Sequence, residues 1–382
     1  HALFLELWNR TQSRDLLAYF YPRLRRYHRF LVGRWGSSTT RMPSNLIRTW
    51  DYFYNSGGWD DYPPQRYVHE HGLEATVAPV ANTAQAIRTA KILRAAALAL
   101  DSDESRRDMA EYDEDIAQLS HALQTHAWDE ASGAFGYVCH DEDRKPTGIL
   151  RDENGENFNL GLGGAYPLVA GICTPAQESR LVTSLMSEAH MWSRCGLSTV
   201  DQSAPYYRDD GYWNGAVWMP HQWYFWKALL DLGRADEAYR IARTGLDVWK
   251  REVERSYNCF EHFIVQTGRG AGWHHFGGLS SPVLSWYGAY HRPGRLTTGL
   301  DAWVAALAIG PDHRQLSAEL SLFGQPRHTP VLIATLNPDA SYVSTWNGEP
   351  IAHRERLPGT LEIELPSGDG HGHLEVTAQR QI

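Results

Sequence analysis

The sequence has no pairing pattern among its cysteines. It contains only four, with no Cys-x-x-Cys spacing: Cys139, Cys173, Cys195 and Cys259. This scatter argues against a structural zinc site and against a disulfide framework. We therefore expect buried thiols.

Positive charge is also scarce. The chain carries 36 Lys and Arg against 45 Asp and Glu, and no segment gathers the basic residues. A nucleic-acid backbone is bound through such clusters, so no nucleic-acid partner is expected. The longest apolar run, residues 92–100, contains Arg94 and falls far short of the roughly 20 residues of a membrane span. We therefore expect a soluble protein with no membrane partner.

The start of the chain has no secretion signal. A helical pattern begins almost at His1, without a basic leader or a cleavage site. This favours a cytoplasmic location slightly, leaves the compartment open and suggests that the N-terminal helix is incomplete. Nothing in the sequence indicates an oligomeric state.

The sequence lacks the motifs of several kinds of catalytic site. There is no Gly-x-Ser-x-Gly elbow for a serine nucleophile and no Gly-x-x-x-x-Gly-Lys-[Ser/Thr] loop for phosphates. Neither His69-Glu70-His71 nor His274-His275 has the i, i+4 spacing of a zinc site. We expect no metal and no cofactor.

Helical periodicity dominates the first three quarters of the chain. One apolar face contains Leu24, Tyr27 and Leu31 after Pro22, a residue that suits the first turn of a helix. Two further stripes, one from Ile116 to Leu123 and one from Tyr239 to Trp249, have the same spacing. Long joints rich in aromatic and acidic residues separate such segments, as is typical of functional loops. Helical hairpins arranged in a ring would fit this pattern.

The pattern changes to short β-prone runs after Pro311. These runs cover residues 330–335, 341–346 and 360–365, and turn signals such as Asn347-Gly348 separate them. The sequence therefore predicts a mainly helical body followed by a small β-rich appendage.

The first chemically interesting cluster is Gly57-Gly58-Trp59-Asp60-Asp61-Tyr62-Pro63. Adjacent carboxylates disfavour double ionisation, and the flanking Trp59 and Tyr62 reduce solvation. Both effects raise the pKa of one carboxyl group, as a general acid requires. A solvated turn with an Asx cap is the alternative interpretation.

The second cluster is Tyr212-Trp213-Asn214-Gly215-Ala216-Val217-Trp218. Indole faces bind the C–H faces of sugars, and an amide such as that of Asn214 bonds their hydroxyl groups. We predict ligand contact for Trp213 and Trp218. For Trp223 and Trp226, which share one helix face, core packing is the better interpretation.

The third cluster extends from Glu261 to Gly270 and continues through Trp273, His274 and His275. A glutamate before an apolar triplet and a Gly-rich turn could be a general base placed at a cleft. A glutamate bonded to a helix end, and histidines satisfied within a loop, are the alternatives. Glycoside hydrolysis uses a pair of carboxyl groups as acid and base. The three clusters offer a candidate acid, a distant candidate base and an aromatic lining between them.

The three clusters together resemble glycoside hydrolase family 63, a family of inverting α-glycosidases. The segment from Gly57 to Pro63 is similar to the family's Ser-Gly-x-Asp-[Asp/Asn]-Tyr-Pro motif, and residues 212–218 resemble its Tyr-Trp-Arg-Gly-Pro-[Ile/Val]-Trp motif, with Asn214 in place of Arg. Residues 261–270 share the Glu and the Thr-Gly-x-Gly frame of the third motif. The resemblance covers about residues 3–309.

The resemblance implies an (α/α)6 barrel with Asp60 as general acid and Glu261 as general base. It implies a catalytic domain at residues 1–310, followed by a small β-rich domain at 311–382. The following residues are the candidates for substrate binding: Trp59, Asp61, Tyr62, Tyr212, Trp213, Asn214, Gly215, Trp218, Trp273, His274 and His275.

The predicted activity is inverting, exo-acting hydrolysis of an α-glycoside. We expect an α-glucosidase acting on a small carbohydrate, either a di- or oligosaccharide or a small glucoside. A hydrolase of mannosyl- or glucosylglycerate is the alternative within enzymes, but Asn214 removes a permanent charge that a glycerate carboxylate would use, although Arg66 or Arg269 could replace it. A related barrel also hosts phosphorylases, for which we find no basic phosphate site. A carbohydrate-binding protein on an inactive barrel is the non-enzymatic alternative.

Overall fold

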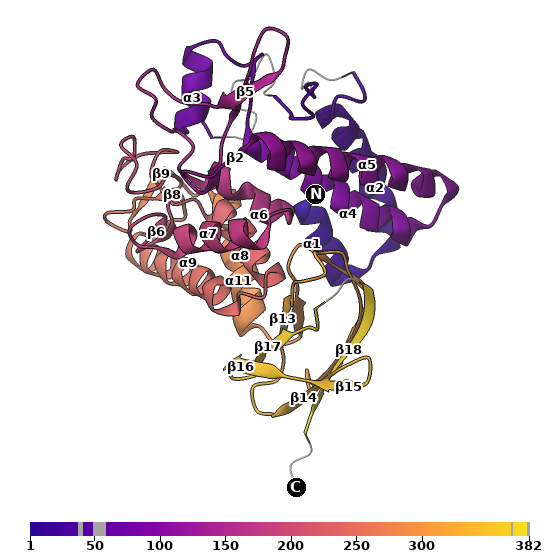
Figure 1. Ribbon diagram of the computed structural model, residues 1–382. Helices are drawn as coiled ribbons and strands as arrows, with labels where there is room; N and C mark the ends of the chain where they lie inside the picture. The colour runs from indigo at the N-terminus through magenta and orange to yellow at the C-terminus, as the bar shows by residue number, and fades with distance from the viewer. Residues whose placement is uncertain (37–40, 49–58, 368–369, 380–382) are drawn as a thin grey trace. The chain divides into compact units, whose positions relative to one another are not determined.

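A computed structural model describes residues 1–36, 41–48, 59–367 and 370–379 (Figure 1). The described chain divides into two compact units. Unit 1 comprises residue 1 and residues 18–218 and 260–274, and unit 2 comprises residues 2–17, 219–259 and 275–382. Each unit is described by itself.

Unit 1 contains a set of helices with short strands between them. Its helices are α2 (Arg14–Leu31, whose first turn belongs to unit 2), α3 (Pro63–Glu70), α4 (Val80–Leu100), α5 (Asp103–His126), the 3-10 helix η1 (Leu162–Ala165), α6 (Tyr166–Ala170) and α7 (Pro175–Met186). Its strands are β1 (Val77–Ala78), β2 (Trp128–Asp129), β3 (Ala134–Phe135), β4 (Val138–His140), β5 (Pro146–Ile149), β6 (Trp192–Ser193), β7 (Gly196–Leu197), β8 (Phe260–Phe263) and β9 (Gly270–His274). Strands β1, β4 and β5 form an antiparallel sheet, and β2–β3, β6–β7 and β8–β9 are antiparallel pairs.

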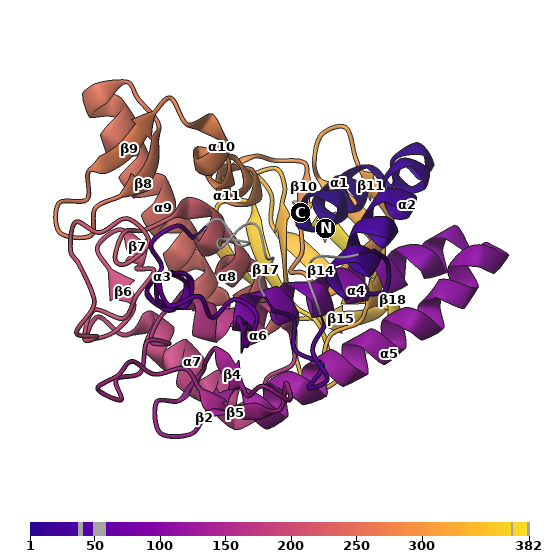
Figure 2. The same cartoon turned by 90° about the horizontal axis from the view of Figure 1, so that it is seen from above.

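Helices α4 and α5 lie side by side and form the longest helical pair of unit 1 (Figures 1 and 2). Helix α4 buries most of its residues, in keeping with an alanine-rich sequence that has no polar face. Helix α5 begins at a capping box, in which the side chains of Ser102 and Ser105 each accept from the backbone N–H of the other. The predicted stripe from Ile116 to Leu123 lies within α5, so this helix is confirmed.

The helix containing Pro22 differs from the prediction. We expected Pro22 in the first turn, but α2 begins at Arg14 and includes Pro22 in its interior. Proline has no N–H, so the carbonyl four residues earlier loses its helical donor. The helix continues because α5 is joined to it through side chains: the Tyr21 hydroxyl donates to Asp108 (2.7 Å), and Arg25 and Arg29 form ion pairs with the same carboxylate.

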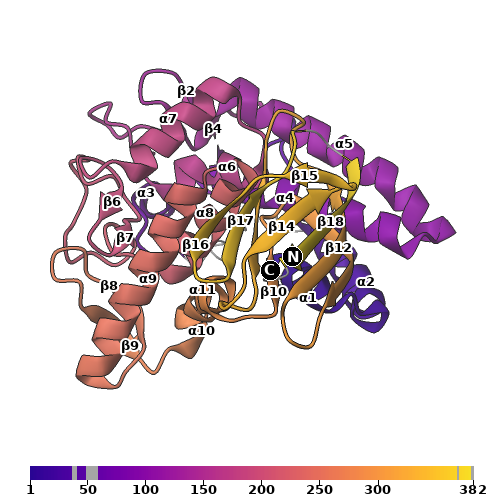
Figure 3. The same ribbon diagram turned by 90° about the horizontal axis from the view of Figure 1, so that it is seen from below.

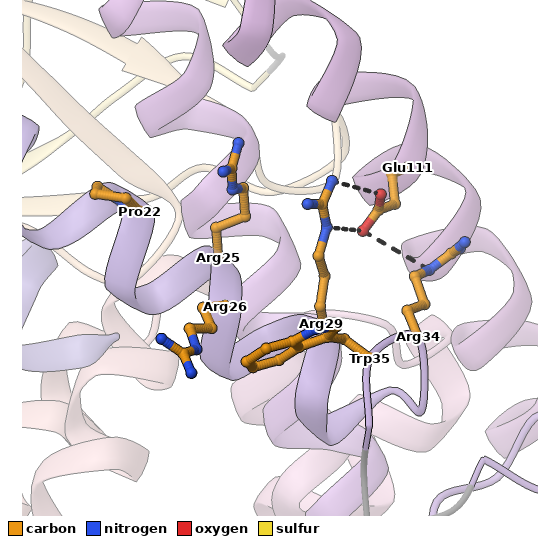
Figure 4. Close-up of a pocket in the computed structure, with 7 residues that line it drawn as sticks. All are labelled: Pro22, Arg25, Arg26, Arg29, Arg34, Trp35 and Glu111. Atoms are coloured by element: carbon orange, nitrogen blue, oxygen red, sulfur yellow. Dashed lines mark hydrogen bonds and ion pairs between the residues drawn. The ribbon is translucent and has the colours of Figure 1, made fainter.

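A charged network holds α2 and the segment after it to α5. The carboxylate of Asp115, which is fully buried, accepts from His28 Nε2 (2.9 Å), Arg34 Nη2 (2.7 Å) and Arg41 Nη1 (2.7 Å). Figure 4 shows the neighbouring pocket of about 690 Å³, in which Arg29 and Arg34 reach Glu111. Arg26 instead lies over the ring of Trp35, 4.3 Å from its centroid. The network is structural, since each carboxylate in it is matched by cations.

Unit 2 combines helices with two antiparallel sheets (Figure 3). Its helices are α1 (Ala2–Thr11), α8 (Met219–Asp231), α9 (Ala235–Ser256), α10 (Gly277–Ser280) and α11 (Pro282–His291). Its strands are β10 (Arg295–Thr297), β11 (Ala302–Ile309), β12 (Gln315–Leu322), β13 (Val331–Thr335), β14 (Tyr342–Trp346), β15 (Glu349–Ile351), β16 (His353–Leu357), β17 (Thr360–Glu364) and β18 (Gly370–Ala378). The sheet orders are β10-β13-β17-β16 and β11-β12-β18-β14-β15.

The two sheets share one apolar core. Leu332 and Ile363 from the first sheet pack with Leu320, Leu374 and Val376 from the second, and all five are essentially inaccessible to solvent. The alternation of buried and exposed residues along β12 and β18 reflects sheets with one buried face. The predicted runs at 330–335, 341–346 and 360–365 are confirmed as β13, β14 and β17.

The helices of unit 2 pack through aromatic residues. Helix α9 contains the predicted stripe from Tyr239 to Trp249, and α8 buries Trp223 and Trp226, which confirms their predicted core role. Trp226 donates its indole N–H to the Tyr290 hydroxyl (3.2 Å) on α11. The strands start at Arg295, ahead of Pro311, so the division of the chain at 310 stays a prediction.

The remaining expectations about the chain concern cysteines and membranes. All four cysteines are free; Cys173 and Cys195 are buried, whereas Cys139 and Cys259 are partly exposed. Within the described ranges, no helix has both the length and the apolar character needed to cross a bilayer.

Candidate active site

The two candidate catalytic carboxylates belong to the same compact unit. Asp60 precedes α3, Glu261 lies on β8, and both are in unit 1 together with residues 212–218. Asp60 is an exposed residue. Gly57 and Gly58, which precede it in the predicted acid motif, lie outside the described residues.

Tyr212 links the two carboxylates electrostatically. Its hydroxyl donates to Glu261 Oε1 at 2.5 Å. Burial, this hydrogen bond and the charges of Glu261 and Asp60 all raise the pKa of Tyr212. The hydrogen bond therefore joins the aromatic segment to the predicted base.

Asp61 differs from Asp60 in its surroundings. Its Oδ1 accepts the backbone N–H of Trp213 at 2.6 Å, so it anchors the aromatic segment to the start of α3. Asp61, one of the two adjacent carboxylates, therefore joins two segments. The other, Asp60, belongs to an exposed residue.

Glu261 is positioned by the β8–β9 hairpin. Its side chain is only 8% exposed, and its second oxygen accepts the backbone N–H of Trp273 on β9 at 3.2 Å. The hairpin is in turn fixed to the aromatic segment by two backbone hydrogen bonds between Val217 and Phe263, of 2.9 and 3.0 Å. Both oxygens of the predicted base therefore have a defined donor.

Gly272 allows the close approach of β9 to Glu261. It has φ of +75°, and a Cβ atom there would lie 2.4 Å from Glu261 Oε2. Only glycine adopts this conformation at little cost and leaves room for the carboxylate.

We expect Gly272→Ala to displace Glu261 and to lower kcat at least about tenfold, since small errors in the position of a catalytic group have large effects. Gly277→Ala is the matched control because no atom lies within 4 Å of its added Cβ. Steady-state kinetics with circular dichroism on both variants would check this. Equal activity in the two variants would contradict it.

The predicted aromatic lining forms a continuous stack. Trp213 lies between Trp59 (ring centroids 5.5 Å apart) and Trp218 (3.7 Å), and both pairs are nearly parallel. His262 continues the stack on the far side of Trp218, at 5.1 Å. Burial lowers the pKa of His262, whereas the charges of Glu261 and Asp61 raise it. The stack rigidifies the segment between the two carboxylates.

Two of the predicted binding residues are buried deep in this layer. Tyr62 and Trp218 are each 1% exposed. The Tyr62 hydroxyl accepts the N–H of Gly163, and the Trp218 indole N–H donates to the carbonyl of Tyr212. Their burial suits support of the lining, and their contact with a sugar stays a prediction.

Asn214 and Gly215 form a tight turn against the preceding loop. The carbonyl of Asn214 accepts the N–H of Arg208, and a Cβ at position 215 would lie 1.8 Å from the carbonyl oxygen of Arg208. Glycine is therefore required at 215. Within the described residues, Asn214 Oδ1 is buried without a hydrogen-bond partner.

The last predicted residues lie at the solvent-facing end of the hairpin. Trp273 is 71% exposed, and His274 and His275 are also exposed. The surrounding segment, which we expected to be a joint between helices, contains strand β9.

His262 follows Glu261 directly, but its role could not be predicted from the sequence. Its position in the stack depends on contacts with Trp218 and Tyr212, which no local pattern reveals. Among the residues that the structure describes, no group of three or more His, Cys, Asp or Glu side chains could hold a metal ion.

Comparison with known proteins places the chain among glycoside hydrolases. Residues 1–277 match the model of the mannosylglycerate hydrolase MGH1-like glycoside hydrolase domain. The mannosylglycerate hydrolase of Thermus thermophilus is 32% identical over 126 residues, which cover 32% of this chain and 28% of that protein. The mannosyl-oligosaccharide glucosidase of Saccharomyces cerevisiae is 28% identical over 125 residues, 28% of this chain and 15% of that protein.

A solved structure shares the fold. A family 63 mannosylglycerate hydrolase from Thermus thermophilus, in complex with glucose, superposes with a TM-score of 0.51 at 22% identity and covers 75% of this chain and 72% of that one. The resemblance to family 63 drawn from the three motifs is confirmed. The chain belongs to the mannosylglycerate hydrolase MGH1-like family of glycoside hydrolase domains.

Proposed function

We propose that this chain is an inverting, exo-acting α-glycoside hydrolase, with α-glucosides as its substrates. The observation that carries the proposal is the setting of Glu261, whose two carboxylate oxygens accept from the Tyr212 hydroxyl and the Trp273 N–H beside a stack of tryptophan rings. Two carboxylates beside an aromatic lining are the requirement of this reaction class.

In this mechanism Asp60 is the general acid. Asp60 is an exposed residue directly before α3. It donates a proton to the glycosidic oxygen as the bond to the anomeric carbon breaks.

Glu261 is the general base. It takes a proton from a water molecule, and that water attacks the anomeric carbon on the face opposite the leaving group. Donors on both of its oxygens fix the orientation of the carboxylate, which suits a base that must meet a water at one defined position. We predict that the two carboxyl groups lie about 6.5 to 9.5 Å apart, the span that leaves room for the water.

The buried aromatic stack, in which Trp59 and Trp218 cover the two faces of Trp213, would support the sugar site from behind. We propose further that the helices complete an (α/α)6 barrel, the fold that the family resemblance implies, and that the small β-rich part begins near residue 311.

The alternative substrate is mannosylglycerate. The matching family model and the Thermus relative, which is named a mannosylglycerate hydrolase, support it. Against it, Asn214 offers no charge to a glycerate carboxylate, and Arg66, one of the two possible replacements, forms an ion pair with Glu70 at 2.7 Å. We therefore place a neutral leaving group first.

One experiment tests both the chemistry and the substrate. A panel of α-linked gluco- and manno-disaccharides together with mannosylglycerate is incubated with the protein, and proton NMR identifies the first anomer released. We expect the β-anomer of glucose, because attack from the opposite face inverts the configuration. Release of the α-anomer would contradict the inverting mechanism, turnover of mannosylglycerate alone would select the alternative, and binding without turnover would indicate a carbohydrate-binding protein.

A further inference from the structure

The Tyr212 hydroxyl contacts the predicted base directly. We propose that Tyr212 is a positioning residue, which orients the carboxylate of Glu261 through its 2.5 Å hydrogen bond and keeps that carboxylate ready to accept a proton. This inference rests on the proposed function, because it assigns Tyr212 a role through the base.

The Tyr212 ring is held in place from several sides. Its backbone carbonyl accepts the indole N–H of the buried Trp218 at 3.1 Å. The rings of Trp218 and His262 contact it edge to face, with centroids 4.9 and 5.1 Å away. A phenol fixed in this way presents its hydroxyl at one place, so it is a pre-organised donor rather than an adaptable one.

The second donor to Glu261 comes from another segment. The N–H of Trp273 reaches Oε2, while Tyr212 reaches Oε1. Two donors on different segments define the rotation of the carboxylate about its last bond, which one donor alone would not. They also leave the remaining lone pairs for the water that the base must activate.

Trp213, the residue after Tyr212, connects this segment to the segment that contains the predicted acid. Trp213 donates its N–H to Asp61, the residue after Asp60, at 2.6 Å. Residues 212 and 213 therefore tie the strand of the base to the segment of the acid. Tyr212 contributes the part of this link that reaches a predicted catalytic group directly.

The test is Tyr212→Phe, which removes one oxygen and keeps the ring. We expect kcat to fall about ten- to hundredfold, the range that the loss of a hydrogen bond to a charged group produces. KM should change by less than about twofold, since the ring remains, so the loss should appear in kcat and not in KM.

The matched control is Tyr67→Phe. The Tyr67 hydroxyl donates to the carboxylate of Glu153 at 3.4 Å in the same unit, so this variant also loses a tyrosine–glutamate hydrogen bond, but away from the base. Its kcat and KM should match those of the unmodified protein. Thermal melts on both variants check that each is folded.

The outcomes separate this inference from the proposed function. If Tyr212→Phe keeps its kcat while Glu261→Gln is inactive, the positioning role is wrong and the hydrolase assignment stands. If Glu261→Gln retains full activity, the proposed function itself fails. A Tyr212→Phe variant that raises KM with kcat unchanged, or that only loses thermal stability, would also overturn the positioning role.

Discussion

Glu261→Gln is expected to lower kcat by about 10²- to 10⁴-fold, the contribution of a general base, while the affinity for a sugar stays largely intact. Glutamine has almost the same shape as glutamate, but its single carbonyl oxygen accepts from only one of the two donors, the Tyr212 hydroxyl or the Trp273 N–H. It cannot take the proton of the attacking water. The loss should therefore appear in kcat and in kcat/KM by a similar factor, as steady-state kinetics would reveal.

Asp60→Asn should have an effect of the same size, because an amide cannot protonate the leaving oxygen. Glu70→Gln is a suitable control for both variants, since Glu70 is an exposed carboxylate whose partner is Arg66. Calorimetric titration with glucose would check that binding survives in the two catalytic variants. Normal turnover by either of them would remove that residue from its assigned role.

Asp115→Asn is expected to lower the free energy of unfolding by about 3 to 5 kcal/mol, the effect of removing one partner from a buried ion pair. Asp115 and His28 are both fully buried, and Arg34 and Arg41 approach the same carboxylate. Without its charge, the buried His28 and the largely buried Arg41 lose the carboxylate that they contact. Urea unfolding monitored by circular dichroism would measure the difference.

The control for this stability prediction lies one residue earlier on α5. Glu114, which is half exposed, pairs with Arg34 at 3.0 Å, so Glu114→Gln should change the free energy of unfolding by no more than about 1 kcal/mol. If both variants unfold alike, the buried network does not contribute as argued.

The same carboxylate predicts sensitivity to acid. Burial raises the pKa of Asp115, but the hydrogen bonds and charges of His28 and Arg34 outweigh burial and hold this pKa well below its ordinary value. A depressed pKa contributes stability that is present above about pH 4, the ordinary value of an aspartate, and is lost as the pH falls toward the lower value. The unmodified protein should therefore lose stability below about pH 4 more steeply than the Asp115→Asn variant.

The sequence predicted elements well where periodicity and local chemistry agree. The stripes of α5 and α9 and the runs of β13, β14 and β17 were recognisable because each has the period of its own element. The start of α2 was not recognisable, since a proline usually begins a helix. Only contacts with α5, distant in the chain, explain why this helix continues through Pro22.

The residues of the candidate site were chosen from the sequence and their roles stay predictions, whereas their contacts come from the structure. Residue type and spacing indicated Asp60, Glu261 and the aromatic segment. They did not indicate that Asp61 would bond the N–H of Trp213, or that His262 would join the stack, because these depend on how loops far apart in the chain meet. The role of Gly272 was also hidden, since it follows from a carboxylate that approaches from the neighbouring strand.

The attachment of Asp61 to Trp213 and of Glu261 to Tyr212 has a bearing on how these segments move. The predicted base and the residue next to the predicted acid are thus each bonded to one of two consecutive residues. A displacement of that dipeptide would therefore shift the strand of the base and the segment of the acid together.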